Sequence, residues 1–406
     1  MRNYILLASI SMLAACGGGT GAQTVGSAAP VGGSTPTPTG TFVNPVEAKT
    51  YAGLGVAQHY EYYTQSNGSG QGGQLYAGDA NTVRDSGISV TYDPRDAIFD
   101  ITISRTKASV TVAANRFQDP AHRTNFGGAI QPQASVPNLN LPGDKGIQYL
   151  QTGSSTGGIL TPGTNSADPA VSGTYTVGAQ AYSSSSQTFF YQKPGTTTKY
   201  VTYAGYVRNT LSVTQQTDPG SVTPYYRNTY SLDRAAFVYG EITNNSAVPT
   251  SGTGTYTGDM LATVVFNPLL DSLPNTPTYM QWLSGTQSSV VDFGAKTVKT
   301  TLTGTATAPA FDAYTNHNVS LPAGSTFTAH ANSTIDLVGK GGFTGTFADA
   351  GFVRPGMPDF PVVIAGSSID GAFYGPNGEE LGAGFRIVGG TPDQRIDILG
   401  VLTGKK

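Results

Sequence analysis

The sequence predicts an all-β protein: a carboxy-terminal eight-stranded antiparallel β-barrel, preceded by a β-rich amino-terminal domain and a disordered tether. Only 12% of the 406 residues are charged, whereas Gly (53), Tyr (22) and Phe (17) are abundant, a composition typical of strands and turns. Short runs of alternating apolar and polar residues recur from Tyr51 to Lys406. No stretch of useful length has the apolar spacing of an amphipathic helix.

The charge balance excludes several classes of protein. The formal net charge is −3 and no block is rich in Lys or Arg, so binding to a phosphate backbone has no electrostatic support. The share of charged residues is roughly half that of an ordinary globular protein, which excludes a coiled coil and a charged disordered chain. We therefore expect no nucleic-acid partner.

The first sixteen residues predict export and lipidation. Arg2 supplies a positive charge, residues 4–13 are apolar, and Leu13-Ala14-Ala15 has the small side chains of a cleavage site. Cys16, the only cysteine, follows directly. The four residues resemble the bacterial lipobox, in which the cysteine is joined to diacylglycerol and its amine is acylated. We expect residues 1–15 to be a lipoprotein signal peptide and Cys16 to be the lipidation site; ordinary secretory cleavage beside a stray thiol is the alternative.

The residues after Cys16 predict a flexible lipoprotein tether. Residues 16–50 are mostly Gly, Ser, Thr, Ala and Pro, with almost no large apolar residue before Phe42, and cannot offset the entropy cost of ordering. After cleavage, Gly17 would be the second residue of the mature protein, and it is not an aspartate. In Gram-negative lipoproteins this implies transfer to the outer membrane. We therefore expect a lipid-anchored protein of the outer membrane, exposed at the cell surface.

Residues 51–245 are expected to form the β-rich amino-terminal domain. Apolar and polar side chains alternate in residues 88–92 and again in residues 97–103. An Asp93–Asp96 turn, in which Pro94 fixes φ, separates the two runs, so they predict a hairpin. A second hairpin is expected at residues 188–193 and 199–207, turned at Pro194-Gly195. Residues 115–172 are too rich in Pro, Gly, Asn and Gln to assign.

Residues 246–406 are expected to form the barrel, after a seam at residues 244–249. Eight runs each have one apolar face and one Thr-rich face, as when only one side of a strand is buried. Eight strands can close into a barrel whose interior is filled by side chains, so it is a core and not a pore. The residues expected to face inward are Tyr256, Met260, Ala262, Val264, Phe266, Val291, Phe293, Val298, Leu302, Phe327, Ala329, Ile335, Phe343, Phe347, Ile369, Phe373, Leu381, Ala383, Phe385, Ile387, Ile396, Ile398 and Leu402.

One segment of the barrel carries a family motif. Residues 368–382 read SIDGAFYGPNGEELG. The motif positions are Gly371, Phe373, Tyr374, Gly375, Pro376, Glu379, Glu380, Leu381 and Gly382. They resemble the hallmark near the end of the transferrin-binding protein B barrel, and residues 253–258, 291–298 and 398–406 resemble further segments of that family. In the motif, we expect glycines to allow close strand passage, Pro376 and Gly378 to form a turn, and the aromatics Phe373 and Tyr374 to fill the barrel.

The resemblance implies a non-catalytic surface lipoprotein that binds a macromolecule, with a handle-like domain before its barrel. It leaves the ligand open between an unknown protein and a small iron or haem-type ligand, and it makes an outer-membrane transporter a further expected partner. No position here matches a ligand-contacting residue of the family, so transferrin itself is not the predicted ligand. A structural envelope lipoprotein without a dedicated ligand is the alternative.

The sequence predicts no catalytic residues, no metal site and no cofactor. The G-x-S-x-G sequence at residues 153–157 needs a following helix to act as a nucleophile elbow, and Gly158, Pro162 and Gly163 forbid one, so a glycine-rich loop is expected. The four histidines stand in separate segments without ligand spacing. Neighbours on a strand point to opposite faces, so we expect Glu379-Glu380 to be a solvated carboxylate beside one that bonds the turn backbone.

Tyrosines concentrate between Tyr51 and Tyr239. Adjacent tyrosines on a strand cannot all face inward, and exposed tyrosine suits partner recognition. We therefore take as candidate partner-binding residues Tyr60, Tyr62, Tyr63, Tyr225 and Tyr226. The alternative is that the tyrosines pack along a two-layer core with their hydroxyls at its rim.

Overall fold

The protein is described from a computed structural model. The structure describes residues 40–65, 71–72, 79–80, 86–105, 110–118, 139–140, 143–156, 160–161, 174–175, 182–267, 279–310, 321–322, 324–339, 341–389 and 395–406. No helix within these ranges has the length and apolar character needed to cross a bilayer. The predicted signal peptide, Cys16 and most of the predicted tether lie outside the described residues.

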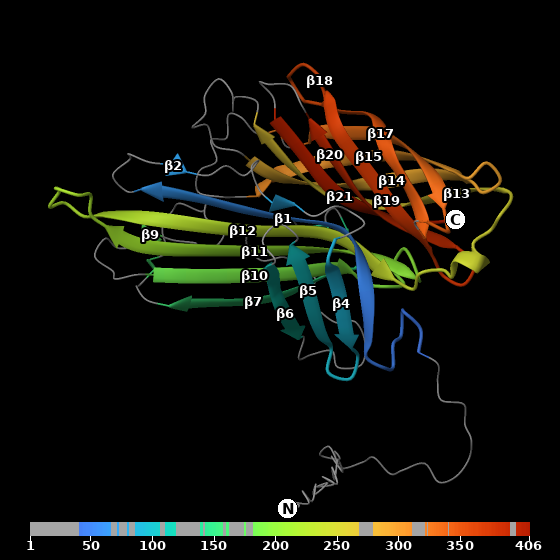
Figure 1. Ribbon diagram of the computed structural model, residues 1–406, viewed down its shortest axis with the longest axis horizontal. Coiled ribbons are helices and arrows are strands. Elements are labelled where there is room, and N and C mark those ends of the chain that lie inside the picture. Colours follow the sequence, from blue (N-terminus) through green and yellow to red (C-terminus); the bar gives the residue numbers. More distant parts are fainter. Residues whose placement is uncertain are drawn as a thin grey trace, which may run out of the picture. The chain divides into compact units, whose positions relative to one another are not determined.

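An antiparallel sheet forms the amino-terminal part of the protein (Figure 1). Its strands pair in the order β6-β5-β4-β1-β12-β11-β10-β7, and β2 and β3 pair with β1. The bounds are β1 (Lys49–Gln65), β2 (Gln71–Gly72), β3 (Asp79–Ala80), β4 (Ile88–Asp93), β5 (Ile98–Arg105), β6 (Val110–Gln118), β7 (Ile147–Thr156), β10 (Tyr182–Gln192), β11 (Val201–Gln216) and β12 (Tyr225–Gly240). Two further short strands, β8 (Leu160–Thr161) and β9 (Thr174–Tyr175), pair with each other.

Both predicted hairpins are confirmed. β4 pairs with β5 and β10 pairs with β11, with each turn where the sequence places it. The long strand β1 joins the two halves of the sheet, since its first residues pair with β4 and the remainder pairs with β12. The buried residues from both halves form one aromatic-rich core, in which the rings of Phe99 and Phe189 lie 5.2 Å apart.

Two expectations for this region are corrected. The residues of the expected glycine-rich loop up to Thr156 lie instead in β7, where Ser154 pairs with Ser185 of β10, because extended serines complete a sheet ladder as well as they form a loop. The expected tether also extends too far, because the structure describes residues 40–50 and buries part of them. Phe42 is buried, with its ring 5.3 Å from that of Tyr51 and 5.8 Å from that of Tyr239, so this segment packs on the aromatic core.

The carboxy-terminal strands form a closed barrel, so the predicted fold class is confirmed (Figure 1). The order is β16-β15-β14-β13-β21-β20-β19-β17, and β16 also pairs with β17, which closes the ring of eight strands; β18 pairs with β17 outside it. The bounds are β13 (Thr253–Asn267), β14 (Tyr279–Asp292), β15 (Thr297–Ala310), β16 (Thr326–Asp336), β17 (Gly342–Val353), β18 (Phe360–Pro361), β19 (Ile364–Tyr374), β20 (Glu380–Gly389) and β21 (Arg395–Lys405). A short 3-10 helix, Asn245–Ala247, precedes the barrel, and the domain boundary at 245/246 stays a prediction.

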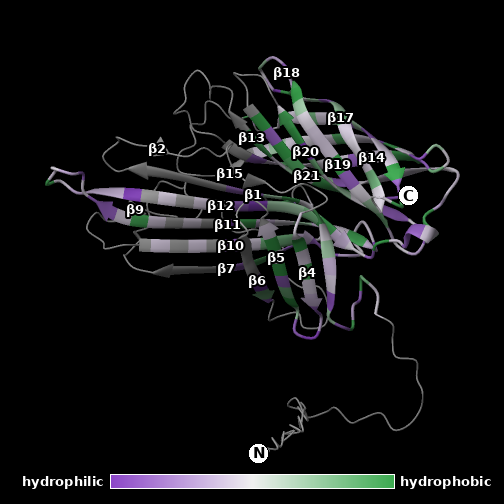
Figure 2. Ribbon diagram, viewed as in Figure 1, coloured by the Kyte–Doolittle hydropathy of each residue, from purple (hydrophilic) through white to green (hydrophobic). Residues whose placement is uncertain are grey.

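Side chains fill the barrel as predicted. All the residues expected to face inward belong to one buried cluster, apart from Phe266, whose side chain is outside the described residues. The ring of Phe373 lies 5.5 Å from that of Phe293 and 5.8 Å from that of Phe343. Figure 2 shows hydrophobic residues concentrated in β20 and β21 of the barrel and in β4 and β5 of the amino-terminal sheet.

The expectation of one polar outer face on every barrel strand is wrong for part of the wall. On β15, Thr301, Thr303 and Thr305 are exposed, as predicted. On β13 and β14, however, the outward-facing Leu261 and Trp282 are buried in a second cluster together with residues of β7, β10, β11 and β12. These barrel strands are covered on both sides, by the barrel core and by the amino-terminal sheet, which explains their continuous apolar runs.

Two glycines of β19 test how tightly the barrel is packed. A methyl group on Gly371 would lie 2.1 Å from Cζ of Phe343, whereas one on Gly366 would meet nothing within 4 Å. We expect Gly371→Ala to lower the free energy of unfolding by about 1–3 kcal/mol, because the ring must move. Gly366→Ala, the matched control, should be neutral or stabilising by up to about 1 kcal/mol. Urea denaturation of both variants gives the comparison, and equal effects would contradict the packing described here.

Candidate binding site where the sheet meets the barrel

The motif at residues 368–382 faces both the barrel core and the amino-terminal sheet. Phe373 and Leu381 point into the barrel, as expected. Tyr374 points the other way and is buried against the sheet, which corrects the expectation that both aromatics fill the barrel. Gly382 lies at the same contact, since a methyl group there would be 2.9 Å from Cγ2 of Val201 in β11. The motif therefore joins two layers of the protein.

The turn of the motif has the expected form. Residues 375–378 form the turn, Pro376 is exposed within it, and Gly375 and Gly378 have φ of +90° and +71°, values that favour glycine. The Glu379 carboxylate accepts a 2.8 Å hydrogen bond from the Asn377 backbone amide, so it bonds the turn as predicted. Burial by itself raises the pKa of Glu379, but the hydrogen bonds with Asn377 and with its own backbone amide together outweigh it, so the pKa is lowered.

Glu380 is buried, which corrects the expectation of a solvated carboxylate. Its Oε1 accepts from the backbone amide of Lys199 at 2.6 Å, and its Oε2 accepts from those of Tyr200 at 2.7 Å and Val201 at 3.1 Å. Burial raises the pKa of Glu380, and the three amides and Lys405 offset part of that effect. One barrel side chain thus binds three consecutive amides where the β10–β11 turn enters β11.

A second polar contact joins the same two layers. Asp397 of β21 is 2% exposed and accepts from Arg386 of β20 at 3.0 and 2.7 Å, in a bidentate pair. The Asp397 Oδ2 also accepts from Nε2 of Gln58 in β1 at 2.7 Å. The buried charge is therefore paired within the barrel and hydrogen-bonded to the amino-terminal sheet.

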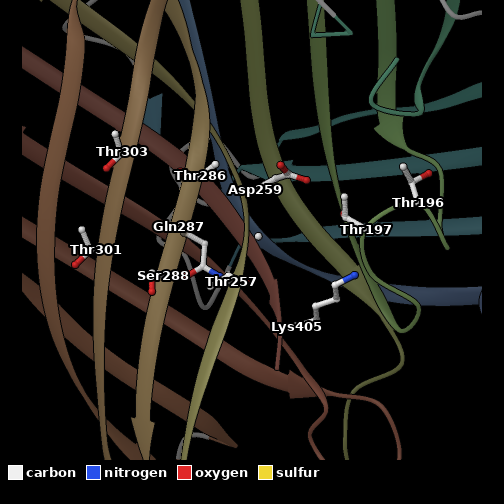
Figure 3. A pocket seen from close by; sticks show the side chains of 11 residues that line it. Thr196, Thr197, Thr257, Asp259, Thr286, Gln287, Ser288, Thr301, Thr303 and Lys405 are labelled. Atoms are coloured by element: carbon white, nitrogen blue, oxygen red, sulfur yellow. The ribbon is translucent and has the colours of Figure 1, made fainter. Parts of the chain in front are cut away.

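A groove opens beside these contacts, with a volume of about 550 Å³, large enough for a small-molecule ligand (Figure 3). Its wall is the outer face of β13, β14 and β15, and its rim is the β10–β11 turn. We call this the hydroxyl groove, and its lining residues are Thr196, Thr197, Thr257, Gly258, Asp259, Thr286, Gln287, Ser288, Thr301, Thr303 and Lys405.

The floor of the hydroxyl groove lies where the pairing of β13 with β21 skips residues 258 and 259. Gln287 occupies this gap: it is 3% exposed and its Nε2 donates to the backbone oxygens of Tyr256 at 3.3 Å and Thr403 at 3.1 Å. A methyl group on Gly404 would lie 2.0 Å from that nitrogen, so glycine leaves room for the amide. The break in the wall is thereby filled by a fixed polar side chain.

The rim is fixed to the wall through one glutamine. Nε2 of Gln192 donates to Oδ2 of Asp259 at 3.1 Å, and its Oε1 accepts from the hydroxyl of Thr197 at 2.6 Å. Gln192 belongs to the amino-terminal sheet and Asp259 to the barrel. Both parts of the protein are thus needed to form the hydroxyl groove. The sequence assigned none of its residues a binding role, because strands far apart in the chain bring them together.

The candidate tyrosines have different surroundings. The side chains of Tyr60, Tyr62 and Tyr63 lie outside the described residues. Tyr225 is half-buried and donates to Oε1 of Gln216 at 3.1 Å, whereas Tyr226 is buried among the residues between sheet and barrel. Core packing is common among the other tyrosines: burial raises the pKa of Tyr149 to about 12 and moves that of Tyr203 well above its ordinary value.

The histidines with described side chains pair with carboxylates. Nδ1 of His59 lies 2.7 Å from Asp233, and Nδ1 of His330 lies 2.6 Å from Asp349 on the exposed outer face of the barrel. Within the described ranges, no group of three or more His, Cys, Asp or Glu residues could hold a metal ion.

Comparison with known proteins places the barrel in a family. Residues 248–406 match the family of "C-lobe and N-lobe beta barrels of Tf-binding protein B". No curated protein sequence matches the chain. Among solved structures, a substitution mutant of transferrin-binding protein B from Haemophilus parasuis Hp5 has 14% identity, covers 89% of this chain and 77% of that one, and has a TM-score of 0.31. An intact protein described as Ap-TbpB, with both lobes, has 12% identity, 90% and 78% coverage, and a TM-score of 0.29.

The residues matched by the family are the same residues that form the eight-stranded barrel. The match begins just before β13 and ends at the last residue of the chain, so it includes every strand of the barrel and the whole of the motif. Residues 248–406 are therefore a β-barrel domain of the transferrin-binding protein B family.

Proposed function

We propose that this chain is a lipid-anchored protein of the outer membrane that captures a macromolecule at the cell surface without catalysing a reaction on it. The observation that carries the proposal is the family of the barrel, whose description refers to a Tf-binding protein. The lipobox-like residues ending at Cys16 and the Gly/Ser/Thr-rich segment after it support anchoring at a distance from the bilayer.

The chemistry of the hydroxyl groove does not suit a haem ligand. Haem iron is held by His, Cys, Met or Tyr side chains, and the lining of this groove includes none of them. A haem-type ligand therefore gains no support from the groove, and we propose a macromolecular ligand instead.

Anchoring is tested by Cys16→Ala. We expect the variant to move from the membrane fraction to the soluble fraction, because removing the acylated cysteine removes all the lipid chains. Immunoblots of the two fractions measure this, with Thr20→Ala in the same segment as the control. Retention of Cys16→Ala in the membrane would contradict the anchor, and survival of the wild-type protein on protease-treated intact cells would contradict surface display.

Binding is tested with the full chain carrying Cys16→Ala, immobilised and exposed to serum and, separately, to purified iron-loaded transferrin. The same chain unfolded in urea during loading serves as the control for non-specific adsorption. A protein retained by the folded chain alone supports the proposal. If the folded chain retains nothing from serum and does not bind purified transferrin, the receptor function is wrong and a structural envelope role takes its place.

A further inference from the structure

We infer that the hydroxyl groove binds a neutral carbohydrate chain. The inference rests on the proposed binding function and adds the place and the chemical class of one ligand.

The first argument is the regular placement of polar groups on the wall. Register pairs Asp259 with Thr286 and Thr286 with Thr303, which forms one row across three strands. A parallel row runs through Thr257, Ser288 and Thr301, and Lys405 extends it onto β21. Neighbouring strands are about 4.8 Å apart and successive outward residues about 6.8 Å apart, so the wall presents a grid of hydrogen-bonding groups.

The second argument is the charge of the lining. Asp259 is its only carboxylate and Lys405 its only ammonium, and the other lining residues are uncharged. A polyanion would meet Asp259 and a polycation would meet Lys405, so an uncharged ligand fits best. Lys405 makes no ion pair within the described part of the chain, which leaves its ammonium available as a donor.

The third argument is the nature of the uncharged groups. Seven lining residues carry hydroxyls, each able both to donate and to accept a hydrogen bond, and none has a large apolar or aromatic side chain. A lipid would find no apolar surface here. A ligand that itself consists of hydroxyls spaced along a chain can pair with both rows, and a carbohydrate has this chemistry.

The fourth argument is that key groups are already held in place. Gln192 orients Asp259, and Gln287 is fixed by two backbone oxygens and by the hydroxyl of Ser289, which donates to its Oε1 at 2.7 Å. Groups that are fixed before binding lose less conformational freedom when a ligand arrives. The hydroxyl groove is therefore suited to weak, polar recognition without a rearrangement.

The test uses the full chain carrying Cys16→Ala, with maltohexaose and the hexamer of N-acetylglucosamine as neutral probes and the hexamer of galacturonic acid as the anionic probe. Saturation-transfer NMR and titration calorimetry measure binding. We expect saturable binding of a neutral hexamer, weaker binding of the anionic one, and a loss of about tenfold in affinity in Asp259→Asn, since a hydrogen bond to a charged group is replaced by a neutral one.

Matched variants on β15 locate the binding. Thr301→Tyr fills the hydroxyl groove and should abolish binding, whereas Thr305→Tyr, on the same strand and face but outside the lining, should leave it unchanged. Thr301→Ala, which only removes a hydroxyl, should weaken binding a few-fold and guards against a folding defect in the larger substitution. The inference is overturned if no neutral hexamer binds, or if the two tyrosine variants behave alike. Retention of a serum protein by a chain that binds no hexamer would leave the proposed function standing and remove this inference alone.

Discussion

Glu380→Ala is expected to lower the free energy of unfolding by about 2–4 kcal/mol. The substitution removes the acceptor for three backbone amides, those of Lys199, Tyr200 and Val201, and Glu380 itself is only 4% exposed. A buried donor without a partner costs about 1–3 kcal/mol, and water can reach only part of this site. Urea denaturation followed by circular dichroism measures the loss.

The neighbouring glutamate is the matched control. Glu379 is partly exposed and its carboxylate bonds Asn377 and its own backbone amide, all within the same turn, so Glu379→Ala should cost less than about 1 kcal/mol. Trp282, the only tryptophan, reports on the contact between sheet and barrel because its ring is buried 5.3 Å from that of Phe190. Its emission should shift to longer wavelength in Glu380→Ala at low urea and not in Glu379→Ala. Equal stability of the two variants would show that Glu380 does not hold the β10–β11 turn.

The barrel could be predicted because its signals are local. In Phe385-Arg386-Ile387 and Ile396-Asp397-Ile398, strict alternation marks the residues that face the core, and the turn residues around Pro376 mark where one strand ends. Such patterns also predicted the two hairpins of the amino-terminal sheet. The pairing of Leu54 with Val238, by contrast, joins residues too far apart in sequence for any local pattern to indicate it.

The contact between the sheet and the barrel is reflected in the sequence by one pattern, which a rule based on alternation alone misreads. Residues 260–266 form a nearly continuous apolar run, as expected of a strand covered on both faces, whereas a rule of one buried face assigns half of them to solvent. Arg386 and Asp397 look like ordinary surface charges in the sequence, yet they pair with each other and Asp397 is buried. The hydroxyl groove could not be predicted because its rows exist only once the register of three strands is set.

A fragment consisting of the barrel alone, residues 248–406, is expected not to remain a soluble monomer. Its outer wall would expose side chains that the amino-terminal sheet now covers, namely Leu261, Val265, Trp282, Tyr374 and Val401. At about 1.5–3 kcal/mol for each buried side chain, the lost burial is on the order of 10 kcal/mol, similar to the whole stability of a domain. Exposed apolar patches of this kind drive association.

Size-exclusion chromatography of the fragment, beside a chain of residues 40–406, measures this effect. A second fragment with Val265→Thr, Trp282→Thr and Val401→Thr separates exposure from failure to fold, because the barrel closes through its own strand pairs and its inner core is unchanged. We expect the substituted fragment to elute as a monomer with the circular dichroism of a sheet, and the unsubstituted one to aggregate. If the unsubstituted fragment were a stable monomer, the sheet would not be needed to cover the barrel wall, and its contact with the barrel would contribute little to stability.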